Sequence, residues 1–203
     1  MTIHKAVARL NSADPILGDM IDRIWPLSFK ARRAPVFQSL VQAIIYQQLS
    51  GKVADVILGR FVALFGEAPF PTADQVLALD PERLRSAGLS RAKAAYIRGV
   101  AEKAASGSLP ALDECDSLAD GKIVERLTEI KGIGRWTVEM FLIFNLGRMD
   151  VLPAHDLGVR RGFQIAYRKR KMPEPAGIER FGVKWKPYRT VAARYLWRAT
   201  DAD

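Results

Sequence analysis

The chain has 203 residues, of which 49% are hydrophobic, so it is long enough to bury a core and too apolar for a disordered tail. Lys and Arg number 31 against 22 Asp and Glu, which gives a net charge of +9. This charge favours a polyanionic partner, and nucleic acid is a better candidate than an anionic membrane. The alternative is a soluble protein that is basic without binding a polyanion. The single cysteine, Cys115, excludes a disulfide, a cysteine-ligated zinc site and a four-cysteine iron–sulfur cluster within the chain, and two histidines argue against a histidine metal centre.

Apolar residues recur at helical spacing along the first half of the chain. Segments 36–50 and 52–66 place apolar side chains three and four positions apart, and Gly66 supplies a stop signal. The longest apolar runs are far too short to cross a bilayer, and residues 1–10 lack the apolar core of a signal peptide. The helical spacing of the apolar residues predicts two long helices, one over 36–50 and one over 52–66.

Helix-start signals continue this pattern up to about Gly107. A capping box and an N-cap followed by proline are predicted at Thr72 with Gln75 and at Asp80 with Pro81. Gly88 and Ser90 separate two further helices.

Residues 108–117 are interpreted as a loop, and Ser117 as the cap of a helix that runs into Ile130. No two-residue hairpin turn joins alternating strands anywhere in the chain. The sequence therefore predicts an all-α fold.

The stretch from 127 to 140, LTEIKGIGRWTVEM, interrupts a helical pattern with two glycines and restarts it at Arg135. Segment 84–97, LRSAGLSRAKAAYI, has the same outline of helix end, glycine-marked turn and new helix, so this unit is expected twice. In a structural interpretation, Gly132 and Gly134 serve backbone conformations with positive φ. In a functional one, they leave backbone N–H groups at a helix start facing an anion, for which a lone G-x-G is a weak signal.

The next helix is expected to run from Arg135 to near Gly147. Its apolar core positions are Val138, Phe141, Leu142 and Leu146. An extended segment then leads to His155 and Asp156, with the aspartate in the first turn of another helix. An aspartate there is usually a cap, but beside an anion-binding hairpin it could also be a carboxylate at a DNA-facing cleft. The charge run 168–176 is either a solvated loop or a basic edge that faces phosphates.

Together these segments resemble the helix–hairpin–helix DNA glycosylases, the HhH-GPD superfamily, and within them the compact form of the alkylation-repair branch typified by 3-methyladenine DNA glycosylase II. GIGRWT matches the hairpin, LPAHDLGVRRGF matches the catalytic-aspartate segment, and Asp156 follows Trp136 by 20 residues, as in that branch. VQAIIYQQLS is similar to the segment that enters the DNA minor groove, and KWKPYRTVAARYLW to the final helix. The matching blocks span residues 36–198.

The resemblance implies two helical lobes with a DNA-facing cleft between them, in one domain over residues 1–203. The hairpin would occupy about 127–140 and the catalytic-aspartate loop about 148–157. It implies a monofunctional DNA glycosylase that flips alkylated purines of the 3-methyladenine type out of duplex DNA and hydrolyses the N-glycosidic bond, which starts base excision repair. Bifunctional relatives carry a lysine where this chain has Trp136, so base removal without strand cleavage is expected.

Damaged double-stranded DNA is the implied partner of a monomer that needs neither a membrane nor a cofactor. We expect it in the cytoplasm with the nucleoid if the source is a bacterium, and in the nucleus if it is a eukaryote. The single cysteine excludes the iron–sulfur cluster of some relatives. The resemblance implies a structural Na⁺ or K⁺ at the hairpin, held by the backbone carbonyls of Thr128, Ile130 and Ile133.

The resemblance also assigns chemistry and base recognition to particular side chains. Asp156 would be the catalytic carboxylate that stabilises the oxocarbenium-like sugar. The base pocket would be formed by Trp136, Trp197, Met140 and Tyr46, with Trp25 as a further candidate ring. Core packing remains the alternative for both family-matched tryptophans. Glu139 is expected at the surface, and His155 either contacts a phosphate or packs.

DNA binding is assigned to two segments. The hairpin would grip a phosphate just beyond the lesion through Gly132, Ile133, Gly134, Arg135 and Thr137. The groove segment would contribute Gln48, Leu49 and Ser50, with Gln48 at the position that plugs the vacated stack and Leu49 as its apolar neighbour.

Two other function classes remain open at this point. The chain could be a non-catalytic protein that binds damaged or structured DNA, in which Asp156 would be dispensable. It could also be a glycosylase for another lesion with lyase activity, which would act through a lysine such as Lys131. The range of alkylated bases accepted also stays open.

Overall fold

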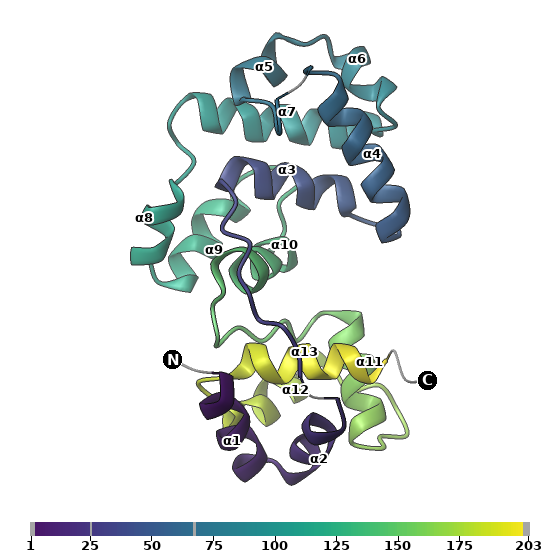
Figure 1. Cartoon of the computed structure of the whole chain (residues 1–203), viewed down its shortest axis with the longest axis vertical. Coiled ribbons are helices and arrows are strands. Elements are labelled where there is room, and N and C mark those ends of the chain that lie inside the picture. Colours follow the sequence, from purple (N-terminus) through teal and green to yellow (C-terminus); the bar gives the residue numbers. More distant parts are fainter. Residues whose placement is uncertain (1–2, 25, 67, 201–203) are drawn as a thin grey trace. The chain divides into compact units, whose positions relative to one another are not determined.

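The computed structural model describes residues 3–24, 26–66 and 68–200 (Figure 1). Within these ranges the chain is helical and has no strand, which confirms the all-α prediction. The helices form two compact units, one of Met1–Arg32 together with Leu142–Asp203 and one of Arg33–Phe141, which correspond to the two expected lobes. No helix in the described ranges is long and apolar enough to span a membrane.

The unit Arg33–Phe141, called here the hairpin unit, is built around its longest helix. Its helices are α3 (Val36–Tyr46), α4 (Gly51–Ala63), α5 (Ala73–Ala78), α6 (Pro81–Ser86), α7 (Arg91–Ala105), α8 (Leu112–Ser117), α9 (Asp120–Thr128) and α10 (Arg135–Met140). Helix α7 packs against α3, α5 and α6, and buries Ala94, Ile97, Val100 and Ala101 at helical spacing. It is therefore the central element of this unit.

The predicted helix starts of the hairpin unit are confirmed. Thr72 and Gln75 form both bonds of a capping box at the start of α5, and the Asp80 carboxylate accepts from the Glu82 N–H at the start of α6. At the start of α7, the Ser90 hydroxyl accepts from the Lys93 N–H. Both partners of each of these hydrogen bonds lie within three residues of each other, so a short sequence window is enough to predict the caps.

Two predictions between residues 108 and 130 are wrong. Part of the segment interpreted as a loop forms α8, and Ser117 ends that helix; Ala119, not Ser117, precedes the first residue of α9. Helix α8 has a single strongly buried side chain, Cys115, and two acidic residues in its first turn that suit the positive end of the helix dipole. Such a short helix leaves too little apolar periodicity to identify it by sequence.

The unit of Met1–Arg32 and Leu142–Asp203, called here the aspartate unit, is centred on the last helix. It contains α1 (Ile3–Ala13), α2 (Pro15–Ile24), α11 (Leu157–Ala166), α12 (Pro175–Phe181), the 3₁₀ turn η2 (Gly182–Trp185) and α13 (Arg189–Ala199). Helix α13 packs against α1, α2, α11 and η2. Helix α11 lies especially close to it, because a Cβ at Gly162 would overlap the Leu196 carbonyl group.

The helix expected from Arg135 to near Gly147 exists, but it changes character on the way. Its first part, α10, continues directly into a π-helical segment, η1, over Phe141–Leu146. The predicted apolar positions are buried, and Gly147 follows with φ of +72°. The stop signal was therefore correct, whereas the π-helical geometry has no sequence signal that we recognise.

A buried carboxylate ties the two ends of the aspartate unit together. Asp14 is 1% exposed and accepts hydrogen bonds from the Tyr167 hydroxyl at 2.5 Å and the Trp185 indole N–H at 2.8 Å, while the Lys184 ammonium lies 3.1 Å away. Burial alone would raise the pKa of Asp14, but these donors and the Leu17 N–H together lower it below its ordinary value.

Candidate functional site

The physical grounds for a glycine differ between the two glycine positions of the hairpin, 132 and 134. Gly132 has φ of +93°, and a Cβ there would lie 2.5 Å from Cδ2 of Tyr96 and 2.8 Å from its Cβ. Conformation and packing therefore both require glycine at this position. Gly134 has φ of −89°, and a Cβ there would meet no atom within 4 Å. Neither backbone conformation nor packing against described residues therefore requires a glycine at 134.

The two helix–turn–helix units differ at the start of their second helix. In the turn before α7, Gly88 has φ of +101°, and the Ser90 hydroxyl caps the helix by accepting from the Lys93 N–H at 3.2 Å. In the turn before α10, Gly134 occupies the N-cap position and has no side chain to accept a hydrogen bond. The architectural unit thus closes its helix start with an N-cap side chain, whereas the 127–140 hairpin has no side chain at its N-cap position.

Sequence reasoning missed Gln47, which connects the groove segment to the hairpin. Its side-chain amide donates to the Gly132 carbonyl at 3.0 Å, and the same nitrogen lies 3.5 Å from the Thr137 hydroxyl. On α7, the Lys93 ammonium donates to the carbonyls of Ile45 at 2.8 Å and Gln47 at 2.7 Å, and burial lowers its pKa. These hydrogen bonds fix the position of the C-terminal end of α3 relative to the hairpin.

The α3–α4 turn presents the predicted groove residues to the outside. Gln48, Leu49 and Ser50 are all exposed, and Gln48 adopts the left-handed region with φ of +57°. Tyr46 is 37% exposed and its hydroxyl bonds to Asp55, so this candidate pocket ring already has a polar partner.

Trp136 lies exposed at the start of α10, which argues against core packing, whereas its place in a base pocket stays a prediction. Its side chain is 44% exposed, so it is not a core residue. Thr137 is 3% exposed, so its hydroxyl is not presented to a phosphate as the prediction requires. Glu139 was predicted at the surface, but it is 6% exposed and accepts from the Arg135 guanidinium at 3.1 Å. Met140 is half-buried on the same helix.

Asp156 begins α11 and has two identified donors. Its Oδ1 accepts from the Val159 N–H at 2.8 Å, as expected of an N-cap, and from the Trp197 indole N–H at 2.7 Å. Trp197 is half-buried, and its ring stacks on Phe144 with centroids 5.7 Å apart. The capping prediction for Asp156 is confirmed, and the indole bond adds an orientation that the cap alone would not impose.

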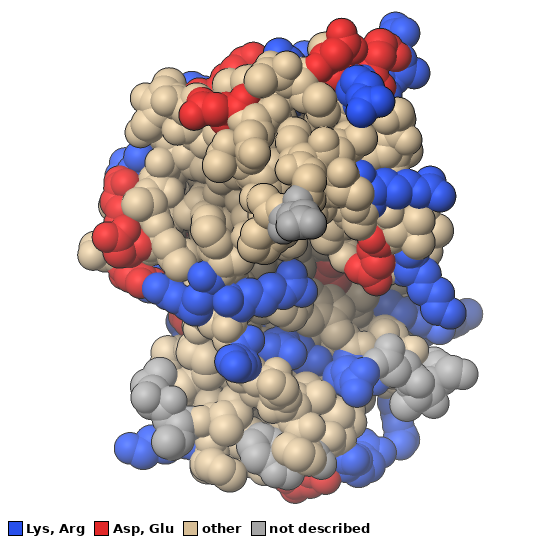
Figure 2. Space-filling model, turned by 45° about the horizontal axis from the view of Figure 1, so that its top comes forward, with Lys and Arg blue, Asp and Glu red and all other residues tan. Residues whose placement is uncertain are grey.

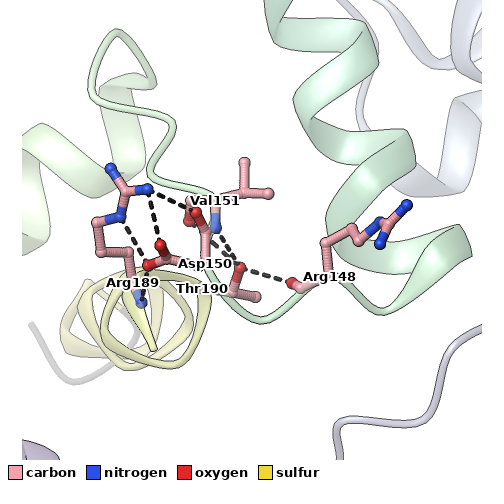
Figure 3. Close-up of polar contacts among 5 residues, drawn as sticks. All are labelled: Arg148, Asp150, Val151, Arg189 and Thr190. Atoms are coloured by element: carbon pink, nitrogen blue, oxygen red, sulfur yellow. Dashed lines mark hydrogen bonds and ion pairs between the residues drawn. The ribbon is translucent and has the colours of Figure 1, made fainter. Parts of the chain in front are cut away.

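The loop that leads to Asp156 is anchored at its start by α13 (Figure 3). Arg189 binds both carboxylate oxygens of Asp150 at 2.7 and 2.9 Å, and it also donates to the Asp150 carbonyl. The Thr190 hydroxyl donates to the Arg148 carbonyl at 2.7 Å and accepts from the Val151 N–H at 2.9 Å. Because Trp197 lies on the same helix, α13 holds this loop at both of its ends.

Other predicted residues fall outside such networks or outside the described ranges. His155 is exposed, so it does not pack in the core, and Leu157 beside Asp156 is 66% exposed. Trp25 lies outside the described residues. Arg168 and the basic residues up to Lys171 are exposed, and Figure 2 shows Lys and Arg side chains spread over the face in view.

Of the hairpin carbonyls expected to hold a cation, that of Thr128 belongs to the last residue of α9, and those of Ile130 and Ile133 lie in the turn between α9 and α10. Ile130 already accepts from the Ile133 N–H at 3.0 Å, which leaves its second lone pair. Among the described residues, no group of three or more His, Cys, Asp or Glu side chains could hold a metal ion.

Known proteins are similar to this chain in sequence and in fold. Residues 41–187 match the HhH-GPD superfamily of base excision DNA repair proteins. The chain is 40% identical over 164 residues to DNA-3-methyladenine glycosylase 1 of Schizosaccharomyces pombe, which covers 81% of this chain and 72% of that protein.

Solved structures agree with this match. The S. pombe 3-methyladenine DNA glycosylase Mag1 in complex with abasic DNA has a TM-score of 0.89 at 35% identity, with 97% of each chain covered. A DNA-3-methyladenine glycosidase from Bacillus halodurans has a TM-score of 0.85 at 39% identity, with 96% of this chain and 88% of that chain covered. The chain therefore belongs to the HhH-GPD superfamily of base excision DNA repair proteins.

Proposed function

We propose that the protein is a monofunctional DNA glycosylase that removes alkylated purines of the 3-methyladenine type from duplex DNA. The observation that carries this proposal is the Asp156 carboxylate, which is fixed by the Val159 and Trp197 N–H groups at the start of α11. The matched relatives named as 3-methyladenine glycosylases support the same reaction and substrate class.

The Asp156 carboxylate suits hydrolysis of an N-glycosidic bond. The sugar becomes oxocarbenium-like as the bond breaks, and a nearby negative charge stabilises it and can orient or deprotonate the attacking water. A 3-methylated adenine already carries positive charge, so it leaves without a strong general acid. One well-held carboxylate is therefore sufficient for this substrate class.

Trp136 is the side chain best suited to contact the extruded base. Extruding a base costs a few kcal/mol, and less when the base is damaged. Stacking on an aromatic face recovers about 1–3 kcal/mol per base, and a cationic base gains a further cation–π contribution. The 44% exposed indole of Trp136 offers such a face.

The hairpin would supply the sequence-independent grip on DNA. The backbone N–H groups that follow Gly134 bind a phosphate at the open start of α10, and Arg135 contributes positive charge. The exposed turn with Gln48 and Leu49 enters the groove and fills the space of the extruded base.

No cofactor takes part in the proposed reaction, because hydrolysis needs only water and the carboxylate. A Na⁺ or K⁺ ion would suit the hairpin carbonyls of Thr128, Ile130 and Ile133, since the carboxyl end of a helix carries partial negative charge and neutral oxygens fit a monovalent cation. Such an ion would stiffen the hairpin without entering the chemistry.

Incubation of the protein with methylated duplex DNA, followed by chromatography of the released bases, tests the proposal. We expect release of 3-methyladenine and intact strands bearing abasic sites. Borohydride should trap no covalent complex, because Trp136 stands where lyases carry their lysine. Tight DNA binding without base release would instead indicate a non-catalytic binding protein, and a trapped complex would indicate a lyase.

A further inference from the structure

Gly158 lies in the second position of α11, one turn before the close approach of α11 to α13. Its φ is an ordinary helical value, so its backbone conformation does not call for glycine. Glycine also has a lower helix propensity than alanine. The reason for a glycine here must therefore come from its neighbours.

Those neighbours are the two partners of the indole–carboxylate bond. A Cβ on Gly158 would lie 2.7 Å from Cδ1 of Trp197, 3.1 Å from its Nε1 and 3.1 Å from Oδ1 of Asp156. Carbon atoms in real structures do not approach an aromatic carbon to 2.7 Å, so the indole ring would have to shift. Since Trp197 also stacks on Phe144, that shift would disturb its packing as well.

We propose that Gly158 is a positioning residue for base excision. Its missing side chain lets the Trp197 indole N–H reach Asp156, and this bond fixes the direction in which the carboxylate faces the sugar. This role rests on the proposed function of Asp156. In a variant with a side chain at position 158, the Val159 N–H would still donate to the Asp156 carboxylate, so the start of α11 would persist while the orientation of the carboxylate is lost.

Gly158→Ala tests this role, with Gly177→Ala as its matched control. Gly177 lies in α12 of the same unit, and a Cβ there would meet no atom within 4 Å. We expect Gly158→Ala to slow single-turnover base excision by roughly 10–100-fold, as misplacement of a catalytic group by about 1 Å does, with unchanged affinity for duplex DNA. The control should match the wild type in both measurements.

A double-mutant cycle with Trp197→Phe separates positioning from general damage. Trp197→Phe removes the indole N–H, so the double variant should be no slower than Trp197→Phe alone if Gly158 acts through that bond. Multiplied losses in the double variant, or full activity of Gly158→Ala, would overturn the proposal.

A second readout does not depend on activity. In a ¹⁵N spectrum, the indole resonance that Trp197→Phe abolishes should shift in Gly158→Ala and stay in place in Gly177→Ala. An unshifted resonance in Gly158→Ala would refute the positioning role. If the wild type released no base, the proposed function would fail, while this spectrum would still test whether Gly158 controls the bond.

Discussion

Asp156 caps α11, and under the proposed function it also supplies the catalytic negative charge; two substitutions can separate these roles. Asp156→Asn removes the negative charge but keeps an oxygen that can accept from the Val159 N–H and the Trp197 indole N–H. Asp156→Ala removes both the charge and the acceptor. The difference between the two variants therefore measures the cap together with the indole bond, and the asparagine variant measures the charge.

The expected magnitudes follow from these contacts. Loss of one electrostatic group aimed at the transition state costs about 10²–10³-fold in rate, or ~2.7–4 kcal/mol, so Asp156→Asn should lose at least that much excision. Loss of a side-chain N-cap costs about 0.5–2 kcal/mol of stability, and a protein of this size loses roughly 2–4 °C in Tm per kcal/mol. Asp156→Ala should thus melt a few degrees lower, whereas Asp156→Asn should melt close to the wild type.

The assay is single-turnover release of 3-methyladenine, measured beside thermal unfolding and duplex affinity for all three proteins. Saturating protein removes differences in DNA binding from the comparison of rates. A folded Asp156→Asn variant that excises within about threefold of the wild type would refute the catalytic assignment. Equal Tm values for the alanine and asparagine variants would refute the contribution of the cap.

Three further substitutions test the remaining assignments. Trp136→Leu should reduce excision of a cationic base by the ~1–3 kcal/mol of one stacking contact and change Tm by only about 2 °C, so a large Tm loss with unchanged excision would contradict the pocket role. Gly134→Asp should weaken the binding of damaged and undamaged duplex alike by about tenfold or more, as expected for the loss of one charge-assisted hydrogen bond. The control Gly121→Asp, at a position on α9 where a Cβ meets no atom within 4 Å, should leave both affinities unchanged. A loss of affinity confined to damaged DNA would place the hairpin at the lesion instead. Asp14→Asn should cost about 3–5 kcal/mol at pH 7 by urea unfolding. Because the folded-state pKa of Asp14 is lowered, the contribution of its charge is present above the unfolded-state pKa of about 4 and is lost as pH falls through the folded-state pKa, so the difference between wild type and variant should shrink in acid; an unchanged difference across this range would show that the carboxylate charge is not what stabilises the fold.

Local signals in the sequence were sufficient for most of the helices and their ends. Thr72, Asp80 and Ser90 each act within three residues of their own position, so a short window contains both partners of each bond. The same holds for Asp156 as the cap of α11. Helix α8 falls in a segment interpreted as a loop, because six residues with one buried side chain produce no periodic pattern, and no helix is predicted over α1, α2 or α12 either.

Contacts between residues far apart in the sequence could not be predicted, because no local sequence pattern specifies which distant residue fills a given space. The indole of Trp197 lies 41 residues along the chain from Asp156, and the amide of Gln47 lies 85 residues from Gly132. Glu139 was misplaced for the same reason, since its burial depends on surroundings that its own helix does not specify. The family resemblance assigned roles to Asp156 and the hairpin, but not to the residues that hold them.

Each unit uses its central helix to hold a functional segment in place. In the hairpin unit, α7 supplies Lys93 to the end of α3 and Tyr96 to the hairpin turn. In the aspartate unit, α13 supplies Thr190 and Trp197 to the two ends of the loop that carries Asp156. Under the proposed function, preorganisation of this kind would let the Asp156 carboxylate stabilise the transition state without reorganising during the reaction. Under the proposed function, one fixed negative charge suits a base that already carries positive charge and leaves without a general acid.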